Sequence, residues 1–317
     1  MAQTLDQYAD SLDLRRDLQW PAPPDVEEVR AKPHLKKLPD VRAVVWSVYG
    51  TLLSISYGEL QIDHPVRFVM EVALEKTIQE FKMWKSMTRK PGNPADVLIV
   101  WYRAILDEMK LQTLPGERYP EVAYNKIWEA IVKKLMTNEY VYLASQYGDL
   151  MEYGQKIAYF FHASLQGTRC PEGAARTIYH LNETIGNQGL LADGQCFTWT
   201  QLKRGLRAQD PAMRFEAMLP AAAHTFSFEL RAKKPSDRLF KAALAHFAKE
   251  GLTAEQILHV GSHLHHDIVP ARKHGMRTAL YAGDKNSLRA TTEELKNKDL
   301  RPDVLITELP QLLEVVG

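Results

Sequence analysis

The 317-residue chain carries 40 lysines and arginines against 39 aspartates and glutamates, so its formal net charge of +1 offers no general attraction for nucleic acid or for an anionic membrane surface. Its hydrophobic fraction of 45% and charged fraction of 25% are typical of a globular protein, and its length suggests about two domains. The two cysteines, Cys170 and Cys196, are too few for a disulfide framework. Residues 1–16 lack the apolar core of a signal peptide, and no stretch approaches the ~20 apolar residues of a membrane span. We expect a cytoplasmic protein with no nucleic-acid and no membrane partner.

Residues 1–40 form a proline-containing leader. Its five prolines favour an extended arm on the surface, with one short helix around Leu5–Leu18. The first strand is predicted over Ala43–Val48, where β-branched residues follow one another. It leads into a tight turn at Gly50–Thr51, which places small polar groups and backbone amides at the end of a buried strand.

Residues 57–164 have a helical character. Apolar residues recur at helical spacing over residues 66–87, 94–111, 122–135 and 153–165. No convincing strand interrupts these four segments. The pattern predicts a helical bundle inserted after the first strand.

From residue 165 to the end of the chain, helix and strand patterns alternate. Helices are predicted at 172–183, 236–249 and 268–274, and strands at 189–192, 257–260, 278–281 and 303–306. Alternation of this kind implies a parallel sheet with helices on both faces. We therefore expect residues 41–56 and 165–317 to form an α/β domain with a Rossmann-like sheet, and the charged stretch 287–299 to be a solvated helix or loop.

The loop after the first strand, Ser47-Val48-Tyr49-Gly50-Thr51, resembles the nucleophile loop of the haloacid dehalogenase (HAD) superfamily. The family pattern is hydrophobic-Asp-x-(Asp/Tyr)-Gly-Thr-Leu, and its first Asp attacks phosphorus or carbon. Ser47 occupies that position, and Tyr49 matches the dehalogenase branch. The resemblance implies a HAD-like core with residues 57–164 as a helical cap over the site.

Three further segments match the family in the expected order. Ala192 stands where the family has a Ser or Thr that holds a phosphoryl oxygen, and Asp193 follows it. Lys234, before Pro235, matches the lysine that neutralises anionic charge. In the last segment Asp267 keeps the second of two family aspartates.

The first of those two aspartates is replaced by Ser262, so the resemblance implies a degenerate active site. Family members bind Mg²⁺ through the missing carboxylates, and a neutral hydroxyl is a far weaker Mg²⁺ ligand. We expect Mg²⁺ binding to be largely lost and no metal site to remain. Ser47 is a poor nucleophile unless a base activates it, and no His or Lys lies at a sequence spacing that indicates one.

The leading hypothesis is a HAD-like protein that lacks the aspartyl-nucleophile, Mg²⁺-dependent activity and binds a small anionic ligand or a protein partner. The anion would be held by the Ser47 hydroxyl, the Gly50 and Thr51 amides and Lys234. The family-equivalent catalytic positions are Ser47, Tyr49, Lys234 and Asp267. The alternative is an active phosphatase or dehalogenase-like hydrolase with Ser47, Cys196 or Asp193 as nucleophile.

Two other readings concern metal and partner binding. His263-Leu264-His265-His266-Asp267 is one residue short of the zinc motif of metallo-β-lactamase-type hydrolases, and two of its histidines with Asp267 would suit zinc. The basic segment Lys82–Lys90, with exposed Trp84, would suit a protein partner, and a homodimer is also considered. Solvated or helix-capping histidines are the favoured alternative for the first segment, and an amphipathic helix explains the second equally well.

Overall fold

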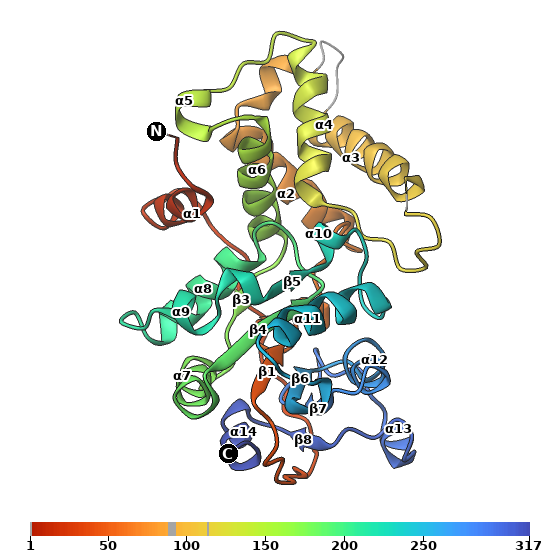
Figure 1. Ribbon diagram of the computed structural model, residues 1–317. Helices are drawn as coiled ribbons and strands as arrows, with labels where there is room; N and C mark the ends of the chain where they lie inside the picture. Colours follow the sequence, from red (N-terminus) through yellow and green to blue (C-terminus); the bar gives the residue numbers. More distant parts are fainter. Residues whose placement is uncertain (1, 88–92, 113) are drawn as a thin grey trace.

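The computed structural model describes residues 2–87, 93–112 and 114–317 (Figure 1). A core built around a parallel sheet lies below, and a helical cap lies above it (Figure 1). The sheet strands are β1 (Ala43–Trp46), β4 (Asn187–Ala192), β5 (His224–Phe226), β6 (Ile257–Gly261), β7 (Arg277–Tyr281) and β8 (Val304–Ile306). All neighbouring pairs are parallel and the order is β5-β4-β1-β6-β7-β8, which confirms the predicted α/β, Rossmann-like fold.

Strand β1 lies between β4 and β6 because its residues can be buried on both faces. Val44 and Trp46 pack into one apolar cluster, and Ala43 and Val45 pack into another on the opposite face. This alternation follows from the two-residue period of a strand. Trp46, the last residue of β1, is level with Leu190 of β4 and Val260 of β6. The loop that begins at Ser47 therefore leaves from the centre of the carboxyl edge of the sheet.

Helices cover both faces of the sheet. The core helices are α7 (Ala174–Ile185), α8 (Thr198–Gln209), α9 (Phe215–Met218), α10 (Ser227–Leu230), α11 (Asp237–Lys249), α12 (Val269–Lys273), α13 (Thr292–Lys296) and α14 (Leu312–Val315). Short 3₁₀ segments lie at η1 (Ser56–Gly58), η3 (Ala221–Ala223), η4 (Ala254–Gln256) and η6 (Leu309–Gln311), and η5 (Leu264–Ile268) is a π-helical turn. Helices α7, α8 and α14 pack on the face of Trp46, whereas α11 and α12 pack on the face of Val45.

The cap is inserted between two short strands. The strands β2 (Ser54–Ile55) and β3 (Thr168–Arg169) pair antiparallel, so the chain enters and leaves the cap side by side. Between them lie α2 (Arg67–Glu80), η2 (Met83–Ser86), α3 (Pro94–Leu111), α4 (Tyr124–Met136), α5 (Ala144–Tyr147) and α6 (Leu150–Leu165). The apolar faces of these helices meet in a separate cluster that contains Trp128 and Phe160.

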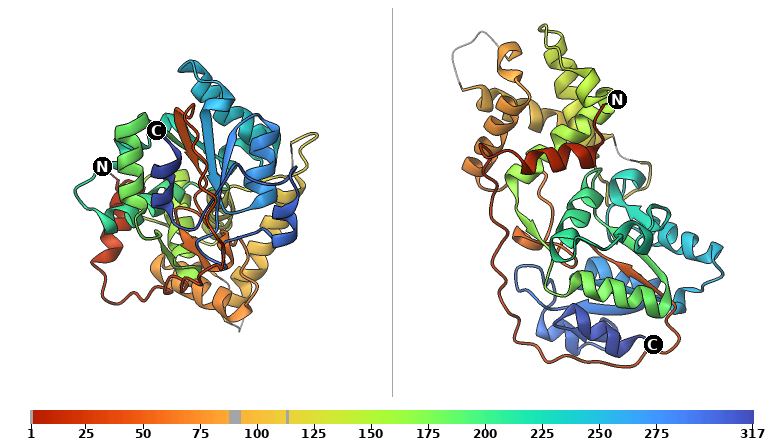
Figure 2. Two further views of the ribbon diagram at one scale, coloured as in Figure 1. Left: turned by 90° about the horizontal axis from the view of Figure 1, so that it is seen from below. Right: turned by 90° about the vertical axis from the view of Figure 1, so that its left-hand side faces the viewer.

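The leader is an arm that runs along the whole molecule. Its helix α1 (Leu5–Asp13) lies beside the cap, and the following chain passes down the outside of the core to the bottom of the sheet (Figure 2, right). There the backbone of His34 forms an antiparallel bridge with Leu305 of β8. The helix is shorter than the predicted 5–18, since it ends before Arg15.

The structure contains core elements that periodicity did not predict. Strand β5 is only three residues long, too short for an alternating pattern to stand out. Helix α8 has a polar outer face and Gly205 in its interior, which weakens its helical pattern. Within the predicted 287–299 stretch, only α13 is regular helix. These additions complete the sheet and support the site without changing the fold class.

Candidate functional site

The site lies where the four predicted loops meet at the carboxyl edge of the sheet. Ser47 follows β1, Asp193 follows β4, Lys234 follows β5 and α10, and Asp267 follows β6. Side chains from all four loops line a cavity of about 280 Å³. The cap adds the walls around Tyr124, as expected for a cap over the site. Ligands of open α/β sheets bind in this kind of crevice.

Lys234 connects two of the loops at the floor of the cavity. Its Nζ donates a hydrogen bond to Ser47 Oγ at 2.8 Å and to Asp267 Oδ1 at 2.5 Å, and all three side chains are buried. This contact places a basic group beside Ser47 that the sequence spacing did not reveal. Lys234 lies 187 residues further along the chain, and only the parallel pairing of the strands brings the two together.

Asp267 is surrounded by donors. Its Oδ2 accepts from the amide of His263 at 3.0 Å, and His259 Nε2 lies 3.3 Å from Oδ1. Burial alone would raise the pKa of Asp267, but the adjacent Lys234 ammonium and the His259 contact outweigh it and hold that pKa well below its usual range. Asp267 is therefore a carboxylate engaged in a buried ion pair.

The donor set does not fit the Mg²⁺ ion of the superfamily. A Mg²⁺ site needs hard oxygen ligands in octahedral geometry, usually with one or two carboxylates. Here the positions of two family carboxylates are the hydroxyls of Ser47 and Ser262, and the remaining carboxylate, Asp267, already contacts the Lys234 ammonium. Within the described residues no group of three or more His, Cys, Asp or Glu side chains is arranged to hold a metal ion.

The turn after β1 uses the two amides that were predicted to bind an anion. Gly50 N donates to Leu53 O at 2.8 Å, and Thr51 N donates to Val48 O at 3.1 Å. Neither residue lines the cavity. The preceding amides, of Val48 and Tyr49, make no hydrogen bond to any other described residue. The unpaired donors of this loop are therefore two residues nearer to Ser47 than predicted.

Gly50 is needed for the shape of this turn. Its φ of +79° is a left-handed conformation that side chains disfavour. A Cβ atom at this position would lie 2.7 Å from Ser262 Oγ and 2.8 Å from Gly58 O. The glycine of the family pattern thus lets the first loop approach both the fourth loop and the entrance to the cap.

Tyr49 lines the cavity, and its side-chain hydroxyl is held by helix α8. Its hydroxyl donates to Gln201 Oε1 at 2.7 Å and lies 3.0 Å from Thr198 Oγ1, and both partners are on α8. Burial raises the pKa of Tyr49, so the phenol stays protonated. It positions the loop on α8 and does not supply an acid or a base.

Two carboxyl groups that are close enough to repel each other face the cavity from its other side. Asp193 Oδ1 accepts the amide of Lys234 at 2.7 Å, and Glu121 Oε2 accepts the hydroxyl of Ser227 at 2.9 Å. Burial, followed by repulsion from Asp193, raises the pKa of Glu121 to about 7. Burial also raises the pKa of Asp193. Glu121 comes from the cap and was missed by the sequence analysis, because no motif marks it.

The remaining sequence candidates lie apart from the floor of the cavity. Burial raises the pKa of Cys196 to about 12, and its thiol does not line the cavity. His265 lies 2.6 Å from Glu294 on the surface, whereas the rings of His263 and His266 stack at 3.8 Å. His265 is therefore turned away from Asp267, whereas His263 and His266 line the same cavity as Asp267.

The basic cap segment is only partly described. Lys85 Nζ lies 5.5 Å from the centroid of the exposed Trp84 ring. Arg89 and Lys90 lie outside the described residues. Separately, no helix in the described ranges is long and apolar enough to cross a membrane.

Comparison with known proteins points to a HAD-like hydrolase fold. A family model described as HAD-hydrolase-like matches residues 231–312, which include Lys234 and Asp267. The fold also matches the solved 2-haloacid dehalogenase of Pseudomonas syringae pv. Tomato DC3000, with a TM-score of 0.52, 17% identity, and coverage of 86% of this chain and 97% of that one. A HAD phosphatase from Thermococcus onnurineus covers 86% of this chain and 96% of its own, with a TM-score of 0.44 and 15% identity. The chain therefore has a HAD-like hydrolase fold, and residues 231–312 resemble the hydrolase-like family of the HAD superfamily.

A curated relative gives a more particular likeness. Over 205 residues the chain is 29% identical to the glyceraldehyde 3-phosphate phosphatase of Pyrococcus furiosus. The aligned region covers 62% of this chain and 77% of that protein.

Proposed function

We propose that the chain binds a small molecule with a phosphate or carboxylate group in its cavity, and that it lacks the aspartyl-nucleophile, Mg²⁺-dependent reaction of its superfamily. The observation that carries this proposal is the Lys234 ammonium, bonded at once to Ser47 and Asp267. Lys234 bonds to a hydroxyl at the family's nucleophile position, so no carboxylate stands at that position to attack a phosphorus atom or a halogenated carbon.

Anion binding is supported by the donors that remain. The amides of Val48 and Tyr49 have no other partner among the described residues, and Ser47 and Lys234 lie beside them. Lys233 and Arg289 line the outer part of the cavity. Neither of these two cations pairs with a carboxylate within the described ranges. Charge-assisted hydrogen bonds to cations and to unpaired amides are the usual means of holding such a group. The named substrate of the relative, a phosphorylated small molecule, has the same chemistry.

A thermal-shift titration without Mg²⁺ tests anion binding. Inorganic phosphate at millimolar concentration is expected to raise the Tm of the natural chain and to leave the Tm of Lys234→Ala unchanged. Comparing each variant with and without phosphate removes the effect of the substitution on stability itself. Lys285→Ala, an exposed lysine outside the cavity, should respond like the natural chain. No shift in the natural chain would contradict the proposal.

Turnover assays test the loss of the family reaction. The natural chain is expected to hydrolyse neither p-nitrophenyl phosphate nor a 2-haloacid, with or without Mg²⁺. In the Ser47→Asp/Ser262→Asp variant both missing carboxylates return, so phosphatase activity that requires Mg²⁺ is expected. Mg²⁺-dependent turnover by the natural chain would contradict the proposal.

One contact favours a second candidate, a hydrolase that uses Ser47. Lys234 Nζ lies close enough to Ser47 Oγ to accept its proton if the amine were neutral. The neighbouring Asp267 stabilises the charged form instead, which works against this role. Turnover without metal that Ser47→Ala abolishes and Cys196→Ala leaves intact would support this candidate over the first.

A further inference from the structure

Helix α1 contacts the cap through one face and the core domain through the opposite face. Tyr8, Ala9 and Leu12 are buried in the apolar cluster of the cap. The Tyr8 ring meets Phe81 and Tyr147 at centroid distances of 6.2 Å each. The opposite face carries Asp6, Asp10 and Asp13, at the i, i+4 and i+7 spacing of one helical stripe.

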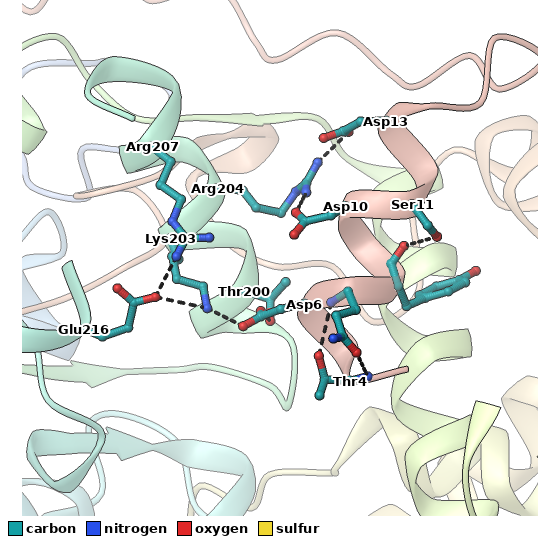
Figure 3. Close-up of polar contacts among 12 residues, drawn as sticks. Thr4, Asp6, Asp10, Ser11, Asp13, Thr200, Lys203, Arg204, Arg207 and Glu216 are labelled. Atoms are coloured by element: carbon teal, nitrogen blue, oxygen red, sulfur yellow. Dashed lines mark hydrogen bonds and ion pairs between the residues drawn. The ribbon is translucent and has the colours of Figure 1, made fainter. Parts of the chain in front are cut away.

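The acidic stripe faces α8 of the core (Figure 3). Arg204 NH1 donates to Asp10 Oδ1 at 2.7 Å, and its NH2 donates to Asp13 Oδ1 at 2.5 Å. Lys203 forms an ion pair with Asp6, whose other oxygen accepts the Thr200 hydroxyl at 2.7 Å. The helix start is fixed by a capping box between Thr4 and Gln7. The same short helix thus joins the cap core to the outside of the sheet domain.

A second set of contacts ties the cap to the core elsewhere. In the segment after α3, drawn in yellow at the right of Figure 1, Glu121 N donates to Arg231 O at 3.2 Å and Tyr119 O accepts from Lys233 N at 2.8 Å. Helix α1 lies at the left of the same view. Glu121 and Lys233 of this second set line the cavity, and no residue of α1 does. The cap also packs on Phe197 of the core, whose ring stacks on His162 at 5.0 Å. Of these attachments, the one through α1 is ionic.

We propose that α1 is a charged clasp: its apolar face travels with the cap, and release of its acidic stripe from Lys203 and Arg204 frees the cap to move over the cavity. The Arg204 pairs are the weaker part of the ionic side, because Asp10 and Asp13 are each 61% exposed and such pairs are screened by salt, whereas Lys203 is only 6% exposed in its pair with Asp6. The apolar side is buried and is not screened. The inference concerns the position of the cap alone, so it does not depend on which ligand the cavity takes.

Distance measurements between spin labels test the clasp in the full chain. Labels at Lys133→Cys on α4 and Glu183→Cys on α7 report the cap and the core, with Cys170 and Cys196 replaced by alanine. The labelled chain that keeps Asp10, Asp13 and Arg204 should give one narrow distance distribution. In Arg204→Glu, which repels Asp10 and Asp13, the distribution should broaden and shift to longer distances. Adding Asp10→Lys and Asp13→Lys restores the opposite charges and should restore the narrow distribution.

Lys273→Glu is the matched control, because it breaks an exposed ion pair with Asp237 that lies wholly within the core. It should leave the distribution narrow. If Arg204→Glu fails to fold, Asp10→Asn/Asp13→Asn removes the same contacts at exposed side chains and should broaden the distribution. A folded variant of either kind with an unchanged distribution would overturn the proposal, and so would broadening that the restored charges do not reverse.

Discussion

At the scale of single residues, Lys234 decides the character of this site. A buried ammonium costs several kcal/mol of desolvation unless a carboxylate and further acceptors surround it. Asp267 and Ser47 supply those partners, and Asp267 in turn is held by the amide of His263. Because Ser47 and Ser262 are uncharged, the Lys234–Asp267 pair balances its own charge.

The stability of this pair can be measured by removing the carboxylate. Asp267→Asn leaves the Lys234 ammonium buried without an ionic partner, and breaking a buried pair in this way costs about 3–5 kcal/mol. Urea denaturation at pH 7 should show this loss in the free energy of unfolding. Asp237→Asn breaks an exposed pair with Lys273 and should cost under about 1 kcal/mol. Equal losses in the two variants would show that the Lys234–Asp267 pair contributes no more than a surface contact.

The raised pKa of Glu121 predicts that its contribution to folding stability depends on pH with the opposite sign to that of Asp267. Its folded pKa of about 7 lies above the ordinary glutamate pKa of 4.5, so the folded state binds the proton more tightly than the unfolded state. The protonated carboxyl therefore stabilises the fold below about pH 4.5, and this contribution is lost as the pH rises through 7. The upper limit of the loss is about 3 kcal/mol.

Thermal unfolding at pH 5.5 and pH 8 checks this sign. The natural chain should have a lower Tm at pH 8, and Glu121→Gln should reduce the difference. Exposed Glu59, which lines the same cavity, provides the control variant Glu59→Gln. A pH dependence that Glu121→Gln leaves unchanged would contradict the assignment.

At the scale of elements, α6 connects the cap core to the cavity wall through one unusual residue. His162 is fully buried, and its ring stacks between Tyr124 at 4.6 Å and Phe197 at 5.0 Å. Both of its ring nitrogens lack a hydrogen-bond partner among the described residues. Burial lowers the pKa of His162 to about 3, so the ring is neutral and acts as an aromatic spacer.

We expect His162→Phe to be neutral or to stabilise the chain by about 1 kcal/mol, because it keeps the stacked ring and removes unsatisfied polar atoms. Urea denaturation measures the change. His162→Ala, which removes the ring and leaves a hole beside Tyr124, should destabilise by about 2–4 kcal/mol. A large loss in His162→Phe would indicate that the imidazole nitrogens have partners in solution.

At the scale of the whole molecule, the chain has separate apolar cores in the cap and under each face of the sheet. The arm joins these bodies. Its helix α1 belongs to the cap core, Glu27 N donates to Asp284 Oδ1 at 3.2 Å, and His34 extends the edge of the sheet at β8. The loop that Glu27 contacts continues into Ser287 and Arg289 of the cavity wall. The arm therefore supports both the cap and one wall of the site.

The sequence alone determined the fold class, since alternating helix and strand patterns and a Gly-Thr-Leu turn after a buried strand require no tertiary information. It also identified Ser47, Lys234, Ser262 and Asp267 as members of one site, because the loops at the carboxyl ends of parallel strands must meet. It could not show that Lys234 bonds to Ser47, or that the Gly50 and Thr51 amides are used within their own turn. It also missed Glu121 and the clasp of α1 on α8. Those features depend on distances between residues remote in sequence, and only the packing of the cap and arm on the sheet fixes such distances.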